Sequence, residues 1–192
     1  MTAHPAGIAA SGATGAIQVT GKRNFSSEAD YAYTGSVPQI TGAGLPATVR
    51  RLIIDNSSGL LANAGVTLSN VVAVTGELIL NKGFLQTSAD RMLTIMDEGV
   101  AITLENNSFV SGPMQKKGKA DFTFPTGWSG PGGGRIPIRI SAMDAVSTIQ
   151  AEYKRASAIN KGATINAPLH HISYCEYWEL FPTNGNPNAV RF

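Results

Sequence analysis

The feature that most constrains the fold is a run of short β-type segments with no helical segment between them. Between about Ala13 and Ser111, segments of 3 to 6 residues rich in Val, Ile, Leu, Tyr and Thr alternate with corners rich in Gly, Asn and Ser. The expected strands are Ile17–Thr20, Asp30–Tyr33, Val37–Ile40, Val49–Ile54, Val66–Leu68, Val71–Val74, Glu77–Leu80, Gly83–Gln86, Met92–Ile95 and Val100–Leu104. Because parallel strands of a βαβ fold need helical crossovers, this pattern argues against the α/β classes.

Two architectures accommodate many short strands without helices: an antiparallel sandwich or barrel, and a parallel β-helix. Weak internal echoes favour the β-helix. They pair Val19–Gly21 with Val74–Gly76, Leu52–Asn56 with Leu93–Asp97, and Gly65–Leu68 with Gly99–Ile102. The echoes share no fixed period, as in a solenoid whose insertions fall in its corners. We expect four or five coils of about 20–25 residues, stacked about 4.8 Å apart.

The pattern changes near Ser111-Gly112-Pro113, where longer alternating segments begin. In Ile136–Ser141, isoleucines alternate with Pro, Arg and Ser, as in a half-buried antiparallel strand. Further strands are expected over Thr148–Arg155 and Leu169–Leu180, and the chain stops at Asn188–Phe192 as if within a strand pair. The expected fold is therefore all-β. A flexible N-terminal tail (1–12) precedes a short right-handed parallel β-helix, or solenoid (13–111), and a small antiparallel β-sandwich-like domain follows (112–192), truncated at its end.

Composition narrows the class of partner. Fifteen basic and thirteen acidic residues give a net charge of only +2, without the concentrated basic face that a nucleic-acid partner needs. A single cysteine excludes an internal disulfide, and no apolar run approaches the length of a membrane-spanning helix. Residues 1–15 lack the pattern of a secretion signal, so an exported protein would carry its signal outside this sequence.

Ionisable groups offer little for catalysis or metal binding. On one strand His171 and Cys175 would lie about 13 Å apart, too far for one zinc ion, so we expect a packed strand with a buried thiol. Asp55 and Asp97 could align at one corner, as the carboxylates of a polysaccharide-cleaving β-helix do, but both lie in turns that Asx hydrogen bonding explains. We therefore expect no metal, no cofactor and no enzymatic activity.

Three residues are candidates for ligand binding. Trp128 lies in a Gly-rich loop that offers little to pack against, so it is either an exposed contact for a glycan or a partner, or a ring folded back over the end of the C-terminal domain. Lys116 and Lys117 form a basic patch that is either a solvated turn or a contact for an anionic glycan or headgroup. Trp178 is expected in the core, with Glu176 paired to an Arg or a backbone amide.

Several segments resemble repeat-rich β-helical surface proteins of Bacteroidota that are exported by the type IX secretion route. The phrases are Ser108-Phe109-Val110-Ser111-Gly112-Pro113, Phe122-Thr123-Phe124-Pro125-Thr126-Gly127 and Ile172-Ser173-Tyr174-Cys175-Glu176-Tyr177-Trp178. Their order and spacing, more than any one phrase, carry the likeness. The resemblance implies an extracellular or outer-surface β-helical stalk joined to a β-rich module, and it implies no catalytic residues.

The expected function is a non-enzymatic structural or adhesion module of a bacterial surface protein, with glycans or other surface proteins as partners. One alternative is a carbohydrate-binding or polysaccharide-cleaving β-helix protein, which a groove lined with Trp or Tyr beside Asp and Arg would favour. Another is a self-assembling filament subunit that associates through its strand edges. No nucleic-acid partner and no membrane span are expected.

Overall fold

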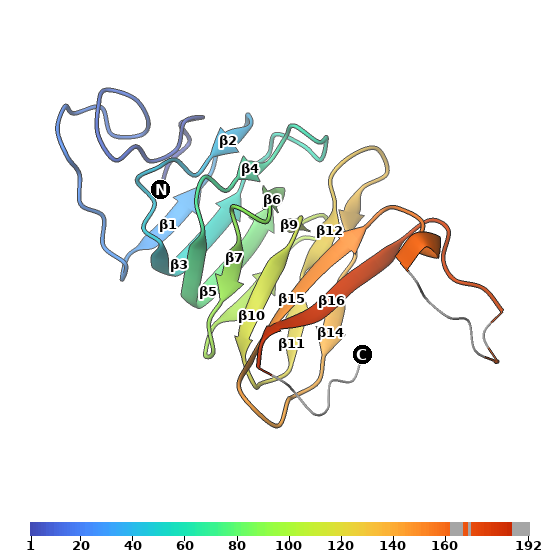
Figure 1. The fold of residues 1–192 in the computed structure, drawn as a ribbon. Helices are drawn as coiled ribbons and strands as arrows, with labels where there is room; N and C mark the ends of the chain where they lie inside the picture. Colours follow the sequence, from blue (N-terminus) through green and yellow to red (C-terminus); the bar gives the residue numbers. More distant parts are fainter. Residues whose placement is uncertain (162–166, 169, 186–192) are drawn as a thin grey trace.

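The computed structural model describes residues 1–161, 167–168 and 170–185, and its chain winds into about four turns of a parallel β-helix (Figure 1). Antiparallel strands follow at the C-terminal end. The expected all-β fold, a short β-helix followed by a smaller antiparallel part, is confirmed. Within the described residues the one helical element is a single 3-10 turn over Ile159–Lys161.

Each coil contributes one strand to each of two sheets, and successive coils pair in parallel. The first sheet contains β1 (Asp30–Tyr33), β3 (Thr48–Asp55), β5 (Val72–Lys82), β7 (Leu93–Ile95) and β10 (Met114–Gly118), with β8 (Val100–Thr103) beside the second half of β5. The second sheet contains β2 (Gln39–Ile40), β4 (Val66–Thr67), β6 (Phe84–Gln86), β9 (Phe109–Ser111) and β12 (Thr126–Trp128). Stacking therefore satisfies the backbone groups that a single coil leaves unpaired.

Columns of aliphatic side chains fill the interior. Val49 lies opposite Val74, and Val74 lies opposite Ile95, so one residue of each coil continues the column. All three side chains are fully buried, and burial of an aliphatic side chain of this size contributes roughly 1.5–3 kcal/mol. The alternation of side chains along each strand, with a period of two, is what keeps such columns inside.

One hydrophobic cluster extends from the first coil into the C-terminal part. It includes Ile8, Leu52 and Leu93 on one side of residue 112, and Phe124 and Ile149 on the other. The expected boundary at residue 112 falls between β9 and β10, and these strands belong to sheets that begin in the N-terminal coils. The C-terminal strands thus share the interior of the solenoid.

The first residues of the chain differ from the expected flexible tail. Thr2 pairs with Tyr33 in parallel, and the backbone N–H of Ile8 donates to the carbonyl of Thr41 at 3.0 Å. These residues continue the ladder below the first coil because its edge would otherwise present unpaired donors and acceptors. The strand predicted over Ile17–Thr20 is wrong: Ile17 and Val19 are exposed and lie in a loop, with no coil to cover them.

The sequence echoes do not mark stacked positions. Leu52 lies opposite Leu78, whereas Leu93 lies opposite Val72, so the echo of Leu52 in Leu93 joins two different columns. Gly65–Leu68 leads into the second sheet and Gly99–Ile102 into the first. The solenoid is correct, but these particular similarities do not define its repeat.

The chain direction reverses after β12. β13 (Gly134–Arg135) pairs antiparallel with β12, β14 (Ile138–Ile140) with β11 (Phe122–Phe124), and β15 (Ser147–Lys154) with β10. β16 (Tyr177–Asn184) then pairs antiparallel with β15. It begins later than the strand expected over Leu169–Leu180; Leu169 itself and the segment Asn188–Phe192 lie outside the described residues.

Candidate functional site

A cavity lies where the chain does not form the next corner of the solenoid between the second sheet and the first. After β6 and again after β9, the chain crosses from the second sheet to the first, the latter time through Gly112-Pro113. After β12 it turns back as β13, and the next strand of the first sheet, β15, arrives from the opposite direction. A hollow of about 660 Å³ remains beside Gly112 and Pro113. This volume is typical of a small-molecule site, for which about 300–1,000 Å³ is usual.

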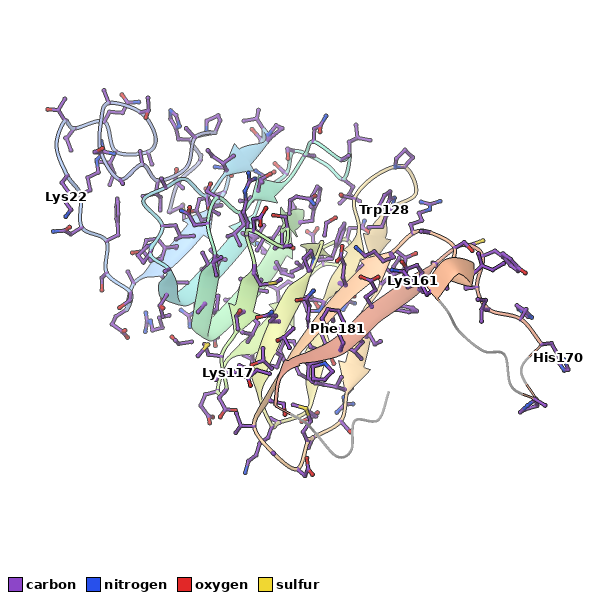
Figure 2. All side chains as sticks on the ribbon, viewed as in Figure 1. Lys22, Lys117, Trp128, Lys161, His170 and Phe181 are labelled. Carbon is purple, nitrogen blue, oxygen red and sulfur yellow. The ribbon has the colours of Figure 1, made fainter. Side chains whose placement is uncertain are left out.

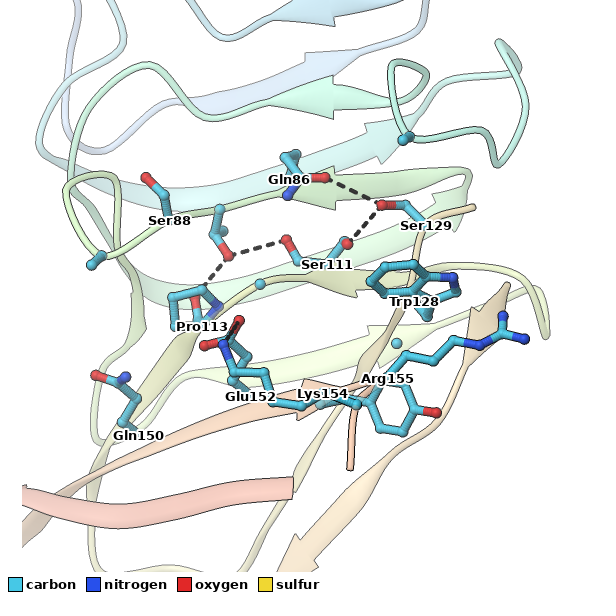
Figure 3. A pocket seen from close by; sticks show the side chains of 17 residues that line it. Gln86, Ser88, Ser111, Pro113, Trp128, Ser129, Gln150, Glu152, Lys154 and Arg155 are labelled. Atoms are coloured by element: carbon cyan, nitrogen blue, oxygen red, sulfur yellow. Dashed lines mark hydrogen bonds and ion pairs between the residues drawn. The ribbon is translucent and has the colours of Figure 1, made fainter. Parts of the chain in front are cut away.

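We call this hollow the Trp128 groove (Figure 3). One side is formed by polar side chains at the ends of β6, β9 and β12, and the other by the end of β15. The polar side chains are Gln86, Ser111 and Ser129, and the β15 side is Glu152, Tyr153, Lys154 and Arg155. Segments from three successive coils therefore meet at one surface.

Hydrogen bonds fix the polar side of the Trp128 groove. The hydroxyl oxygens of Ser111 and Ser129 lie 2.9 Å apart, and the Ser129 hydroxyl donates to Gln86 Oε1 at 3.4 Å (Figure 3). The Thr87 hydroxyl donates to the carbonyl of Pro113 at 2.7 Å. Thr87, Ser111 and Ser129 are buried, so the half-buried Gln86 amide, which both donates and accepts, is the most accessible polar group on this side.

Trp128 is half-buried at the end of β12, just before the Gly-rich loop, and so lies between the two alternatives of full exposure and a ring folded back onto the protein. Glycine is required at position 130 because a Cβ there would lie 2.9 Å from the indole Nε1. Within the described part of the chain no acceptor reaches that buried Nε1. The indole therefore packs with its pyrrole edge under the loop and contributes to the wall of the groove.

Charges in the Trp128 groove are paired. Lys154 Nζ lies 2.6 Å from Glu152 Oε1, and the Arg155 guanidinium donates to the carbonyl of Pro131 at 2.9 Å. The second contact ties the end of β15 to the Gly-rich loop beyond Trp128. Both walls of the groove are thus joined by a side-chain contact.

Lys116 corrects an expectation, because its side chain is buried and unavailable to an outside ligand. It lies opposite Ile95, at the next place in the column of Val49, Val74 and Ile95. Its Nζ donates 2.7 Å hydrogen bonds to the carbonyls of Met96, Asp97 and Gly99. An ammonium has three N–H donors, so all are used.

The surroundings explain a charge at this depth. A turn at residues 96–99 separates strand β7 from strand β8. This turn directs three backbone carbonyls toward the ammonium of Lys116. The same ammonium lies 5.2 Å from the centre of the Phe122 ring. Burial lowers the pKa of Lys116, while the nearby carboxylates of Asp97 and Glu98 oppose that shift. Lys116 therefore holds the turn in place.

Lys117 is exposed on β10 and points away from the interior. It lies opposite Thr148 at the start of β15, whereas the Trp128 groove is at the end of that strand. Figure 2 shows Lys117 and Trp128 at different places on the molecule. The structure thus does not bring the three sequence candidates together.

The histidine and cysteine region also differs from expectation. His170, His171 and Cys175 are exposed and precede β16, so the prediction of a packed strand with a buried thiol is wrong. Among the described residues no group of three or more His, Cys, Asp or Glu side chains could hold a metal ion. Asp55 lies opposite Lys82, and Asp97 lies in the turn after β7, so the two carboxylates do not align.

Trp178 packs on the sheet, as a half-buried residue. Its ring meets Tyr153 edge-on at 5.5 Å, and its Nε1 donates to the carbonyl of Ile136 at 3.3 Å. Glu176 accepts from the Tyr153 hydroxyl, where an Arg or a backbone amide was expected as its partner. Burial, helped by this hydrogen bond, raises the pKa of Tyr153 to about 12.

Sequence reasoning found Trp128 but missed its neighbours in the groove. Gln86 and Ser111 lie opposite each other in register, a relation that no local pattern reveals. Glu152 and Arg155 come from a strand that runs in the opposite direction. Comparisons with protein-family models, with curated proteins and with solved structures find no match for this chain. No helix in the described residues has the length and apolar character needed to cross a membrane.

Proposed function

We propose that this protein is a non-enzymatic adhesion module that binds a glycan in the Trp128 groove, with the β-helical coils as its scaffold. The observation that carries the proposal is the half-buried indole of Trp128 beside a hydrogen-bonded surface of hydroxyl and amide groups. A scaffold of stacked strands keeps these groups in place before a ligand arrives, which reduces the entropy lost on binding.

The groove offers what a sugar ring needs. A pyranose has an apolar face of C–H groups and an edge of hydroxyls. The electron-rich face of an indole attracts such C–H groups, and the Gln86 amide, held by the hydrogen-bonded Ser129, can exchange hydrogen bonds with the hydroxyls. Ligand sites of this kind combine an apolar surface with a few fixed polar groups.

Binding without cleavage is supported by the state of the nearby carboxylates. Glycoside hydrolysis uses two carboxyl groups flanking the scissile bond, one as acid and one as base or nucleophile. Here Glu152 is paired with Lys154, and Glu176 accepts from the Tyr153 hydroxyl. Glu152 is therefore neutralised by a cation, and one oxygen of Glu176 is occupied by the Tyr153 hydroxyl.

The proposal includes an extracellular or outer-surface location for the protein. The resemblance to β-helical surface proteins of Bacteroidota supports an extracellular or outer-surface place, exported by the type IX route. Hydrogen-bonded coils with a glycan site at one end would suit a stalk that presents its contact surface away from the cell. Glycans or glycosylated surface proteins are then the partners.

A glycan array followed by isothermal titration calorimetry, whose signal does not depend on Trp128, tests the proposal. We expect Trp128→Ala to weaken binding at least tenfold, because the aromatic surface of the groove is lost, while Trp128→Phe retains much of it. Leu104→Ala, which removes an exposed side chain outside the groove, should bind as the unchanged protein does.

Two results would count against the proposal. One is the absence of binding to every saccharide on the array. The other is binding that Trp128→Ala leaves unchanged, since the contact would then lie elsewhere. Release of shorter products from a bound polysaccharide would contradict the non-enzymatic part alone.

A further inference from the structure

A second hollow adjoins the Trp128 groove. It has a volume of about 270 Å³, just below the usual range for a small-molecule site. Trp128, Tyr153 and Arg155 line both hollows, so these three residues form their common wall. On the far side the second hollow is lined by Gly132, Cys175 and Glu176. The two hollows therefore lie on either side of the same three residues.

Polar groups of the second hollow remain available to a ligand. Glu176 is exposed, and its Oε2 accepts from the Tyr153 hydroxyl, so its Oε1 is the atom we assign to a ligand hydroxyl. Arg155 is anchored through one nitrogen to the carbonyl of Pro131, and a guanidinium has five N–H donors in all. Both groups stand beside the indole, where a chain leaving the first hollow would pass.

The charged side chains of the two hollows determine which class of glycan fits. The two hollows together contain two cations, Lys154 and Arg155, and two carboxylates, Glu152 and Glu176. An anionic glycan would meet Glu176 where it leaves the first hollow, and leaving two like charges close together is unfavourable. A neutral chain of hydroxyl-bearing sugars meets donors and acceptors of both kinds without such repulsion.

We infer that the site takes a neutral oligosaccharide of at least two sugar units, one in each hollow, which passes the Trp128 indole and the Arg155 guanidinium. This inference rests on the proposed function. Glu176 is the specificity-determining residue of the second hollow, since its carboxylate accepts from hydroxyls of the second unit and repels acidic sugars.

The single cysteine of the chain gives a direct readout of the second hollow. Cys175 is exposed and lines that hollow, and it is the only thiol in the sequence. The rate of alkylation by a maleimide is measured in the presence of neutral hexose or N-acetylhexosamine oligosaccharides of one to six units. Tryptophan fluorescence is recorded on the same samples to report occupancy beside Trp128.

We expect a six-unit chain that changes the fluorescence to slow alkylation of Cys175 at least fivefold, while the single sugar leaves the rate unchanged. Glu176→Gln should weaken binding of the six-unit chain about fivefold, since an amide oxygen accepts a weaker hydrogen bond than a carboxylate oxygen does, and leave the single sugar unaffected. The same variant should improve binding of a chain with uronic acid units. Tyr174→Ala provides a control, because Tyr174 is an exposed neighbour that does not line the hollow.

The outcomes separate the two proposals. If long chains bind in a Trp128-dependent manner but Cys175 reacts at its free rate, the second hollow is empty and this inference fails, while the proposed function stands. Equal affinity for one unit and six units would overturn it in the same way. If no saccharide binds, both proposals fail together.

Discussion

The two ends of the solenoid are closed in different ways, and the Trp128 groove lies at the C-terminal end. At the N-terminal end, Thr2 to Ile8 add a further parallel segment below the first coil, so the ladder simply continues. At the C-terminal end the chain reverses, and antiparallel β15 occupies the edge of β10. Reversal leaves the corner above Gly112-Pro113 unfilled, and the Trp128 groove results.

The interior shows the same contrast. Three successive coils supply the aliphatic side chains Val49, Val74 and Ile95 to one column. The coil after them supplies Lys116 at the same place. Aliphatic stacking needs only burial, whereas a buried ammonium needs acceptors, which the turn at residues 96–99 provides. The repeated aliphatic positions thus form the scaffold. Where the repeat is interrupted, as at Lys116, chemically different groups come into contact.

The largest effect is expected in the repetitive coils. Leu78→Ala removes a fully buried side chain from β5 and should lower the free energy of unfolding by about 3 kcal/mol, because a cavity remains in a stacked column. Chemical denaturation followed by circular dichroism measures this. Protein that remains folded should bind saccharide with unchanged affinity; a loss of affinity in the folded state would break the separation of scaffold from site.

A somewhat smaller loss is expected at the buried lysine. Lys116→Met keeps the length of the side chain but leaves three carbonyls without their donor, and should cost about 2 kcal/mol. Lys117→Met, an exposed neighbour on the same strand, serves as the matched control and should change stability by less than about 0.5 kcal/mol. Equal stabilities for the two variants would show that the ammonium is dispensable.

The smallest effect is expected at the last strand. A hydrogen bond from Lys161, whose Nζ lies 2.5 Å from Glu179 Oε1, lowers the pKa of Glu179 below its ordinary value. The stabilisation from this pair is complete above the ordinary pKa of glutamate and is lost as the pH falls through the lowered one. Because both side chains are partly exposed, the loss should stay below about 1 kcal/mol.

Amide hydrogen exchange of β16 between pH 6 and pH 3 detects this loss, after correction for the intrinsic rate. We expect β16 to lose protection while β3 and β5 keep theirs. In Glu179→Gln the difference between the two regions should become less dependent on pH. A uniform response of all strands, in both proteins, would argue against a separately stabilised end.

Much of the fold could be predicted because the signals are local. Asp30–Tyr33 and Gly83–Gln86 are predicted as strands from their aromatic residues and their flanking corners, and they appear as β1 and β6. Ile17–Thr20, with three β-branched residues, has an equally strong local signal but lies in an exposed loop. Whether such a segment pairs depends on a neighbouring coil, which local composition does not report.

Lys116 could have been recognised from the sequence. Along β10 it shares a face with Met114, so the period of two places it inside, but a run of lysines was interpreted by its charge. The Trp128 groove could not have been predicted in the same way. Its walls come from Gln86, Ser111 and Arg155, and they meet only because the chain reverses after β12.

The central claim is that the coils are scaffold and that binding is confined to the unfilled corner. Hydrogen–deuterium exchange of the whole chain, with and without the saccharide that binds best on the array, tests it most directly. We predict new protection at residues 86–89, 111–113, 127–132 and 152–156, and none on β1, β3 or β5. Protection spread along the outer faces of those three strands, or none at the corner, would contradict the account.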